Sequence, residues 1–228
     1  MPETREIIET PQGLRFPRTE VLTPGLEKRL RAGSYEAREA EAVGRLVRRG
    51  DRVLELGGGI GFMSTLMATR RPLEALETFE ANPRLLPYIR QVHALNAAAP
   101  AEAVNAVLST GATGSVPFYL RGNLLASSLD RGVDEDQITE TCEVPQQPIS
   151  EVIARLRPTF LVCDIEGAEA QLLPAADLSG LRAAVIELHP QWIGQPGVQA
   201  VFDAMARAGL SYFPRVSQGK VVSFKRDF

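Results

Sequence analysis

The segment VLELGGGIGF, residues 53–62, places four glycines in five positions directly after a short apolar run. Glycine loses more conformational entropy on folding than other residues, so this cluster is costly unless the backbone must turn sharply or approach another group closely. A buried strand, a glycine turn and a helix together present a helix N-terminus to a nucleotide-like ligand. The segment therefore predicts an α/β fold that binds such a ligand at the carboxyl end of this strand.

Composition narrows the class of protein. The chain has 228 residues, enough for one α/β domain with a sizeable core, and 44% of them are hydrophobic. A net charge of −3 disfavours a polyanionic partner, so we predict no nucleic-acid binding. The N-terminus has no apolar signal region and no stretch approaches membrane-spanning length. We therefore predict a cytoplasmic protein without a membrane partner, with Cys142 and Cys163 unpaired and Cys163 in the core.

Strand and helix patterns alternate along most of the chain, which predicts a Rossmann-like, doubly wound, mostly parallel sheet covered on both faces. We treat residues 1–228 as a single domain, with an N-terminal arm over 1–34 whose first 24 residues are irregular. Residues 110–150 interrupt the alternation and predict a lid-like insert of two β segments, and the tail predicts an antiparallel hairpin. The strands are expected over residues 53–56, 73–80, 103–109, 160–166 and 183–189.

The glycine spacing distinguishes between cofactors. Dinucleotide-binding turns have the pattern G-x-G-x-x-G, whereas this turn reads G-x-G-x-G and has Phe62 at the third dinucleotide position. With Glu55 before it, the segment resembles motif I of class I S-adenosylmethionine-dependent methyltransferases. The resemblance implies that Glu55 addresses the cofactor's ammonium group, and a carboxylate there would repel a pyrophosphate. It places the backbone of four loop residues against the cofactor: Gly57, Gly59, Ile60 and Gly61.

Glu80 ends the second expected strand, in the sequence FEANP. An acid at this position can accept hydrogen bonds from both ribose hydroxyls of an adenosine-bearing ligand, although a solvated strand-end acid is the alternative. We include the following residues, Ala81 and Asn82, in the cofactor site. Asn82 is also expected to cap the next helix, with Pro83 at its first position.

Four further segments resemble the FkbM-type methyltransferases, and the D-x-E-G-x-E pattern is the most specific of them. They are LVCDIEGAEAQLL (161–173), VIELHP (185–190), AGSYEAREA (32–40) and LLASSL (124–129). The resemblance implies S-adenosylmethionine as cofactor, S-adenosylhomocysteine as product, and O-methylation of a hydroxyl on a small molecule, sugar or natural-product intermediate. Tyr35 is then a contact at the cofactor site. The chain departs from the family's common G-A-N-I-G turn, because Gly59 stands in place of the asparagine.

Asp164, Glu166 and His189 are the candidate catalytic residues, because they lie at the ends of the fourth and fifth expected strands. Methyl transfer needs mainly alignment of the reactants, and a hydroxyl nucleophile also benefits from a base. Two carboxylates at a buried strand end need partners or a function, and a neutral imidazole accepts protons near neutral pH. We interpret Glu169 as an acid in a first helical turn, and His93 as a surface or groove residue.

Several alternatives stay open. Asp164, Glu166 and His189 would also permit Mg²⁺, but no spacing in the sequence requires a metal and we predict none. An NAD-dependent oxidoreductase and a non-catalytic S-adenosylmethionine-binding protein are the competing functions. The sequence selects neither the acceptor nor the oligomeric state, and the insert is compatible with a lid or with a contact in a homo-oligomer.

Overall fold

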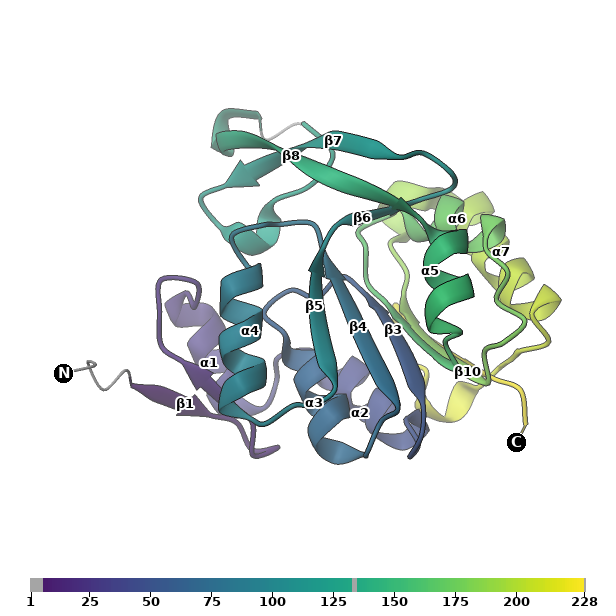
Figure 1. Ribbon diagram of the computed structural model, residues 1–228, viewed down its shortest axis with the longest axis horizontal. Coiled ribbons are helices and arrows are strands. Elements are labelled where there is room, and N and C mark those ends of the chain that lie inside the picture. The colour runs from purple at the N-terminus through teal and green to yellow at the C-terminus, as the bar shows by residue number, and fades with distance from the viewer. Residues whose placement is uncertain (1–5, 133–134, 228) are drawn as a thin grey trace.

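The computed structural model describes residues 6–132 and 135–227, and it confirms the predicted α/β fold (Figure 1). The main sheet has the strand order β11-β12-β10-β9-β3-β4-β5. The five strands from β10 to β5 run parallel, whereas β12 is antiparallel to both β10 and β11 and closes the sheet as the predicted C-terminal hairpin. The strands are β3 (Arg52–Leu56), β4 (Ala75–Glu80), β5 (Ala101–Asn105), β9 (Phe160–Cys163), β10 (Ala183–Glu187), β11 (Ser211–Tyr212) and β12 (Val221–Lys225).

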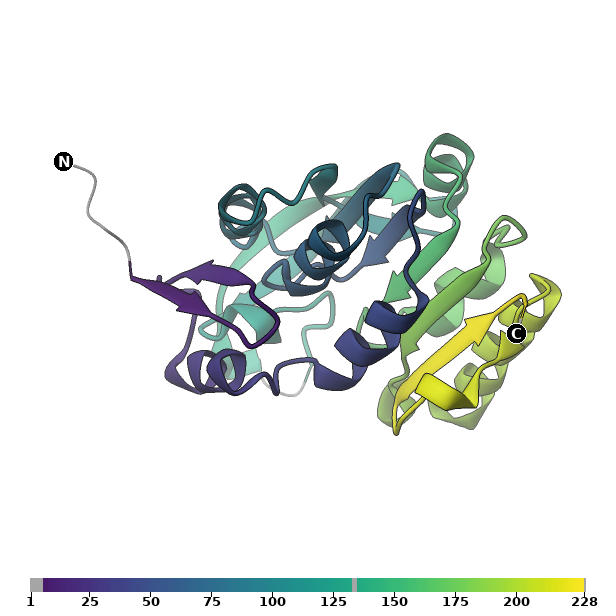
Figure 2. The same cartoon turned by 90° about the horizontal axis from the view of Figure 1, so that it is seen from below.

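Alternating residues of the strands bury two separate hydrophobic cores, as expected for a sheet covered on both faces. Val53 and Phe160 belong to the core that includes α1 to α4, and Leu54 and Leu161 belong to the core that includes α5 to α7. Figure 2 shows the C-terminal hairpin at one edge of the molecule and the N-terminal segment at the opposite end. The helices are α1 (Pro24–Ala32), α2 (Ala37–Leu46), α3 (Phe62–Arg70), α4 (Leu86–Leu95), α5 (Ile149–Leu156), α6 (Glu169–Leu172) and α7 (Pro190–Arg207).

The predicted insert is present, but its sheet also includes the second half of the segment that we expected to be the third strand of the main sheet. The run 103–109 divides at Ala106 into β5 and β6 (Val107–Ser109), and β6 leaves the main sheet to pair in parallel with β8. Together with β7 (Gly114–Arg121) and β8 (Ile138–Pro148) it forms a second sheet of order β6-β8-β7. This sheet lies across the carboxyl ends of the main strands (Figure 1).

The expectation of an irregular segment over residues 1–24 is wrong for its described part. Strands β1 (Ile7–Glu9) and β2 (Arg15–Pro17) form an antiparallel hairpin, and residues 1–5 lie outside the described residues. Ile8 and Phe16 are fully buried, and Phe16 stacks on Phe62 with ring centroids 6.0 Å apart. Burial of these two side chains holds the hairpin against the body of the domain.

Some element boundaries differ from the expected ones in ways that shape the site. Helix α4 begins at Leu86, after a turn over residues 83–85. Asn82 caps this turn by accepting from the Arg84 amide at 2.9 Å, and its side-chain amide donates to the Leu124 carbonyl at 2.9 Å. Strands β9 and β10 end at Cys163 and Glu187. The candidate catalytic residues that follow therefore lie on loops beyond the strand ends.

Further contacts complete the fold. Both cysteines are free, as predicted, and Cys163 is buried. Asp51 is buried and forms an ion pair with Arg182, joining the starts of β3 and β10. Among the described residues, the helices are all too short or too polar to cross a bilayer.

His93 is buried rather than at the surface, with Nε2 2.9 Å from the Ser64 hydroxyl. Burial lowers its pKa from 6.5 to about 4. Below pH 6.5 the unfolded chain binds a proton that the folded chain does not, so this group makes the free energy of unfolding fall as the pH falls. Between pH 7.5 and pH 5, we expect the free energy of unfolding of the native protein to fall by about 2 kcal/mol more than that of the His93→Gln variant. Urea unfolding of both proteins at the two pH values measures this difference, and parallel curves would contradict it.

Candidate active site

A cavity of about 360 Å³ opens at the carboxyl end of the main sheet. It lies where the strand order reverses between β3 and β9, which is the usual ligand site of an open α/β sheet. Residues of the insert, from Leu124 to Asp130, form part of its wall. The buried guanidinium of Arg121 orders this wall by donating to the Ala126, Asp130 and Arg131 carbonyls and to the Ser128 hydroxyl at 2.9–3.1 Å.

Gly57 lies where the loops after β3 and β9 touch. A Cβ atom at this position would lie 1.9 Å from the carbonyl oxygen of Asp164, and its φ of +87° is in the left-handed region. Gly59 faces the cavity with a φ of +52°. Glycine and asparagine are the residues that most readily adopt this conformation. The replacement of the family's common asparagine by Gly59 therefore preserves the backbone of the loop.

Glu80 is the best-oriented candidate for cofactor binding. Its Oε2 accepts from the Gly59 amide at 2.8 Å and its Oε1 from the Asn82 amide at 2.7 Å, and the residue lines the cavity. Each carboxylate oxygen keeps a further acceptor position for a ligand hydroxyl. Burial raises the pKa of Glu80 to about 7, although the amide hydrogen bonds favour its charged form.

The structure divides the predicted cofactor residues into two groups. Five of them line the cavity: Tyr35, Gly57, Gly59, Glu80 and Ala81. The other four lie behind that lining: Glu55, Ile60, Gly61 and Asn82. Ile60 is fully buried in the core, and a Cβ on Gly61 would meet Ile89 at 3.0 Å, so both positions serve packing against neighbouring helices.

Glu55 is almost completely buried beneath the glycine loop. Its Oε2 has no hydrogen-bond partner within the part of the chain that the structure describes, and burial raises its pKa to about 8. Because the side chain does not line the cavity, this placement does not support a direct contact with a cofactor ammonium.

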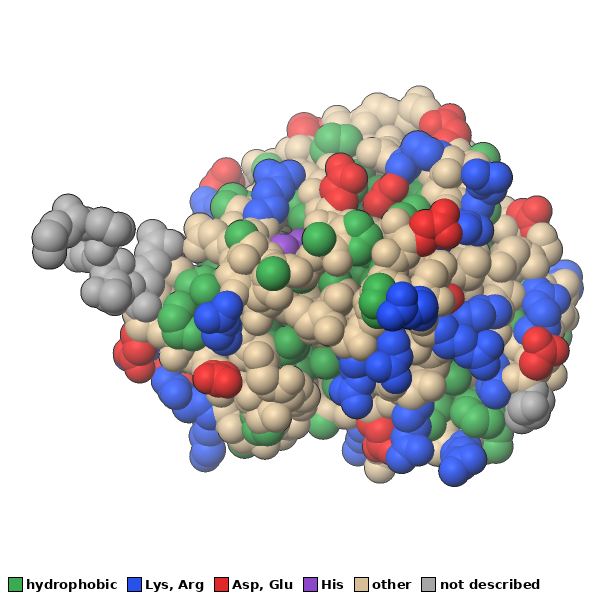
Figure 3. Space-filling model, turned by 60° about the horizontal axis from the view of Figure 1, so that its bottom comes forward, with side chains coloured by type: hydrophobic (Ala, Val, Ile, Leu, Met, Phe, Trp, Pro, Cys, Tyr) green, Lys and Arg blue, Asp and Glu red, His purple; other side chains and the backbone are tan. Residues whose placement is uncertain are grey.

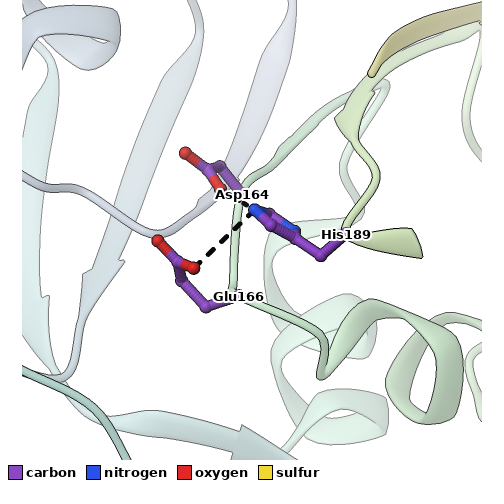
Figure 4. Close-up of side chains that lie close together, drawn as sticks. All are labelled: Asp164, Glu166 and His189. Carbon is purple, nitrogen blue, oxygen red and sulfur yellow. Dashed lines mark ion pairs between the residues drawn. The ribbon is translucent and has the colours of Figure 1, made fainter. Parts of the chain in front are cut away.

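The three predicted catalytic side chains come together at the cavity edge (Figure 4). His189 Nε2 lies 3.5 Å from Asp164 Oδ1 and 3.8 Å from Glu166 Oε2. Asp164 and Glu166 line the cavity, and Glu166 has a φ of +55°, a sparsely populated conformation for a residue with a side chain. Trp192 stacks on the His189 ring with centroids 5.0 Å apart. The geometry thus assembles two carboxylates and one imidazole beside the predicted cofactor loop.

Glu169 belongs to this site more closely than the sequence indicated. It begins α6, as expected of a helix-start acid, but its side chain is fully buried. Its Oε1 accepts from the His189 amide at 3.0 Å and lies 3.3 Å from His189 Nδ1, and its Oε2 accepts from the Gly167 amide at 2.7 Å. A carboxylate can only accept, so Nδ1 carries the proton and Nε2 faces Asp164 and Glu166.

The clustered charges shift the acidities of the site. Burial, reinforced by the charge of Glu187, raises the pKa of Asp164 to about 7, and burial also raises the pKa of Glu166. For His189, burial opposes the charged form, but the hydrogen bond to Glu169 and the neighbouring carboxylates outweigh it and raise the pKa. Asp164, Glu166 and His189 therefore all hold a proton more readily than the same groups do in water.

Glu36 is a cavity residue that was not predicted. It is half-buried, lines the cavity beside Tyr35 and has a φ of +43°. Burial raises its pKa to about 8. Glu36 follows Tyr35 in the segment AGSYEAREA, so the family resemblance that indicated Tyr35 could also have indicated Glu36.

The fold and this cavity are those of a Rossmann-like methyltransferase. Residues 56–212 match the family model described as the methyltransferase FkbM domain. The chain therefore belongs to the FkbM methyltransferase family, and S-adenosylmethionine is its cofactor. Membership of this family argues against the alternative function, that of an NAD-dependent oxidoreductase. Comparison with curated proteins gives no match.

Solved structures support the fold. Trm5b from Pyrococcus abyssi has a TM-score of 0.53 at 10% identity, over 99% of this chain and 56% of that chain. TYW2 of M. jannaschii, in complex with AdoMet, has a TM-score of 0.52 at 13% identity, over 100% of this chain and 89% of that chain. This chain thus spans little more than half of Trm5b. At such low identity the similarity establishes the fold alone.

A second hollow lies at the opposite end of the sheet. Figure 3 shows Lys and Arg side chains gathered on this face. The hollow is lined by residues near the amino ends of the parallel strands, among them Arg45, Arg48, Arg71, Arg182 and Arg215. A cofactor that carries a positive sulfonium fits the acidic cavity and would be repelled here.

The contact at Gly57 yields a stability prediction. We expect Gly57→Ala to destabilise the fold by about 2–4 kcal/mol more than Gly50→Ala does, because the new methyl group would overlap a backbone oxygen that no side-chain rotation can move. Gly50 is the matched control, with a φ of +78° and no atom within 4 Å of the added Cβ. Urea denaturation of both variants provides the measurement, and equal losses would show that the contact is unimportant.

Proposed function

We propose that this chain is an S-adenosylmethionine-dependent O-methyltransferase that acts on a hydroxyl of a small molecule. The observation that carries the proposal is the group of Asp164, Glu166 and His189 at the edge of the cavity that also contains the glycine loop and Glu80. This arrangement brings proton-accepting side chains next to the place where the cofactor would lie. The cavity volume of about 360 Å³ lies in the range of sites for small molecules such as this cofactor.

On the cofactor side of the cavity, both the backbone shape and the acidic side chains suit S-adenosylmethionine. Glu80 would accept the ribose hydroxyls, with Gly59 and Ala81 allowing close approach of the ligand. Glu36 and Tyr35, at the rim, would face the ammonium end, a role that Glu55 does not have the placement for. When bound, S-adenosylmethionine supplies a methyl carbon made electrophilic by the positive sulfur. The carboxylates around the cavity favour that charge.

On the acceptor side, the residues at the ends of β9 and β10 would align the hydroxyl and take its proton. Asp164 and His189 would orient the hydroxyl, and Glu166, whose side chain is 56% exposed, would accept the proton as the new carbon–oxygen bond forms. Glu169 would act through His189 by holding its ring in place.

The cofactor part of the proposal predicts a loss of binding in Glu80 variants. We expect Glu80→Ala and Glu80→Gln to weaken S-adenosylmethionine binding by about 10- to 100-fold or more, because each variant removes charged hydrogen-bond acceptors from a buried site. Calorimetric titration with S-adenosylmethionine, S-adenosylhomocysteine and NAD measures the change. Glu74→Gln, at an exposed residue of a surface ion pair, is the control with unchanged affinity. Binding of NAD alone would refute the proposal.

The chemical part predicts a loss of turnover with cofactor binding retained. Given an acceptor found by screening hydroxyl compounds with methyl-labelled S-adenosylmethionine, we expect Glu166→Gln to lower kcat by about 10²- to 10⁴-fold because the general base is removed. Glu151→Gln, at an exposed position of α5, is the control. Labelling of matched amines in preference to alcohols would refute O-methylation. Cofactor binding without transfer to any acceptor would favour the non-catalytic binding protein.

A further inference from the structure

We propose that Asp164, Glu166 and His189 form a binding site for one divalent transition-metal cation. The site would add a metal to the proposed methyltransferase. It rests on that function only for its purpose, which is to hold the acceptor oxygen. With the ion bound, Glu166 and His189 would act on the acceptor through the ion rather than by direct contact. It revises the prediction from sequence that no metal is bound.

The distances between the donor atoms suit a single ion. One ligand atom from each of the three residues lies within 4.8 Å of the others. Two atoms bound to the same ion at about 2.1 Å can be at most about 4.2 Å apart. The separations of 3.5 Å and 3.8 Å from His189 Nε2 to Asp164 and Glu166 fall inside that limit. Because the three atoms together are only within 4.8 Å of one another, side-chain rotations that bring the two carboxylates closer would complete the coordination.

His189 is held as metal-binding histidines usually are. Its side chain is 5% exposed, and Nδ1 faces the buried Glu169 carboxylate at 3.3 Å. A carboxylate on the far nitrogen fixes the tautomer and the ring orientation, and makes the near nitrogen more basic. Nε2 consequently points toward Asp164 and Glu166, as Figure 4 shows.

Asp164 Oδ1 is incompletely satisfied. The atom is buried and makes no hydrogen bond to any of the residues that the structure describes, and it approaches His189 Nε2 only to 3.5 Å. A buried carboxylate oxygen without a hydrogen bond is costly, and a cation bound there would remove the cost. Glu166 faces the same point, since its Oε2 lies 3.8 Å from His189 Nε2. The cavity in front of both carboxylates leaves coordination positions for water or an acceptor oxygen.

Charge balance also favours a cation over a simple ion pair. Glu169 joins Asp164 and Glu166 around His189, and Glu187 adds a further negative charge close to Asp164. Even a protonated imidazole would offset only one of these charges. Lys220 acts on Glu166 from a distance. A divalent ion would offset two of these charges, and it would draw a hydroxyl of the acceptor into contact.

The mixed ligand set selects the kind of ion. Mg²⁺ prefers oxygen ligands only, whereas imidazole with carboxylates suits first-row transition metals from Mn²⁺ to Zn²⁺. Mn²⁺ also allows a direct test, since its electron paramagnetic resonance signal reports free ion and its spin-echo modulation reports a bound imidazole nitrogen.

The test is a titration of the chelator-treated full chain with Mn²⁺ alone. We expect one saturable ion per chain, a modulation from one nitrogen that is absent in His189→Gln, and at least tenfold weaker binding in Asp164→Asn and Glu166→Gln. Glu151→Gln is the control for general surface charge. Unchanged thermal unfolding without metal would show that each variant is folded.

The outcomes separate this proposal from the proposed function. Failure to bind Mn²⁺, or binding that the three variants leave unchanged, overturns the cation site. If the chelator-treated protein transfers methyl groups at the full rate, the cation does not hold the acceptor oxygen. The proposed methyltransferase function would still stand. Mn²⁺ binding as described, in a chain that does not bind S-adenosylmethionine, would instead support the cation site and overturn the proposed function.

Discussion

The close contact between the loops that follow β3 and β9 is the constraint on which the site depends. The carbonyl of Asp164 occupies the space that a side chain at position 57 would need, and the Asp164 amide donates to the Leu56 carbonyl at 2.9 Å. The Gly57 and Gly58 amides both donate to the Phe79 carbonyl, next to Glu80. The loops after three parallel strands are thereby locked together, which sets the cofactor residues and the candidate catalytic residues in one frame.

Most of the fold could be predicted because local pattern and tertiary structure agree. Apolar runs, glycine turns and helix signals all indicate a doubly wound sheet, and the structure confirms it. The division at Ala106 could not be predicted, because AVNAVLS is a continuous strand pattern. Pairing of Val107 with Gln146 decides where the strand leaves the sheet. The hairpin that buries Ile8 and Phe16 also could not be predicted from local sequence. Its strands are short, and contacts with distant residues stabilise them.

The candidate site was predicted best where a residue follows a strand. Asp164, Glu166 and His189 meet because the carboxyl ends of neighbouring parallel strands share one edge of the sheet. Glu169 was interpreted as a helix-start acid because its contact with His189 joins residues 20 positions apart. Glu55 was placed at the cofactor from its motif, yet strand pleating turns it under the loop. Side-chain direction and long-range contacts were thus the missing information.

The distribution of charge along the sheet gives the site its selectivity. Acidic side chains surround the cavity at the carboxyl ends of the strands, while arginines line the hollow at the amino ends. Burial raises the pKa of Glu36, Glu80 and Asp164 to between about 7 and about 8, so near neutral pH each is readily ionised by a positive charge placed beside it. A sulfonium, an ammonium or a divalent cation that enters the cavity therefore lowers these pKa values and releases protons, whereas an anionic ligand would face both repulsion and protonation of the site.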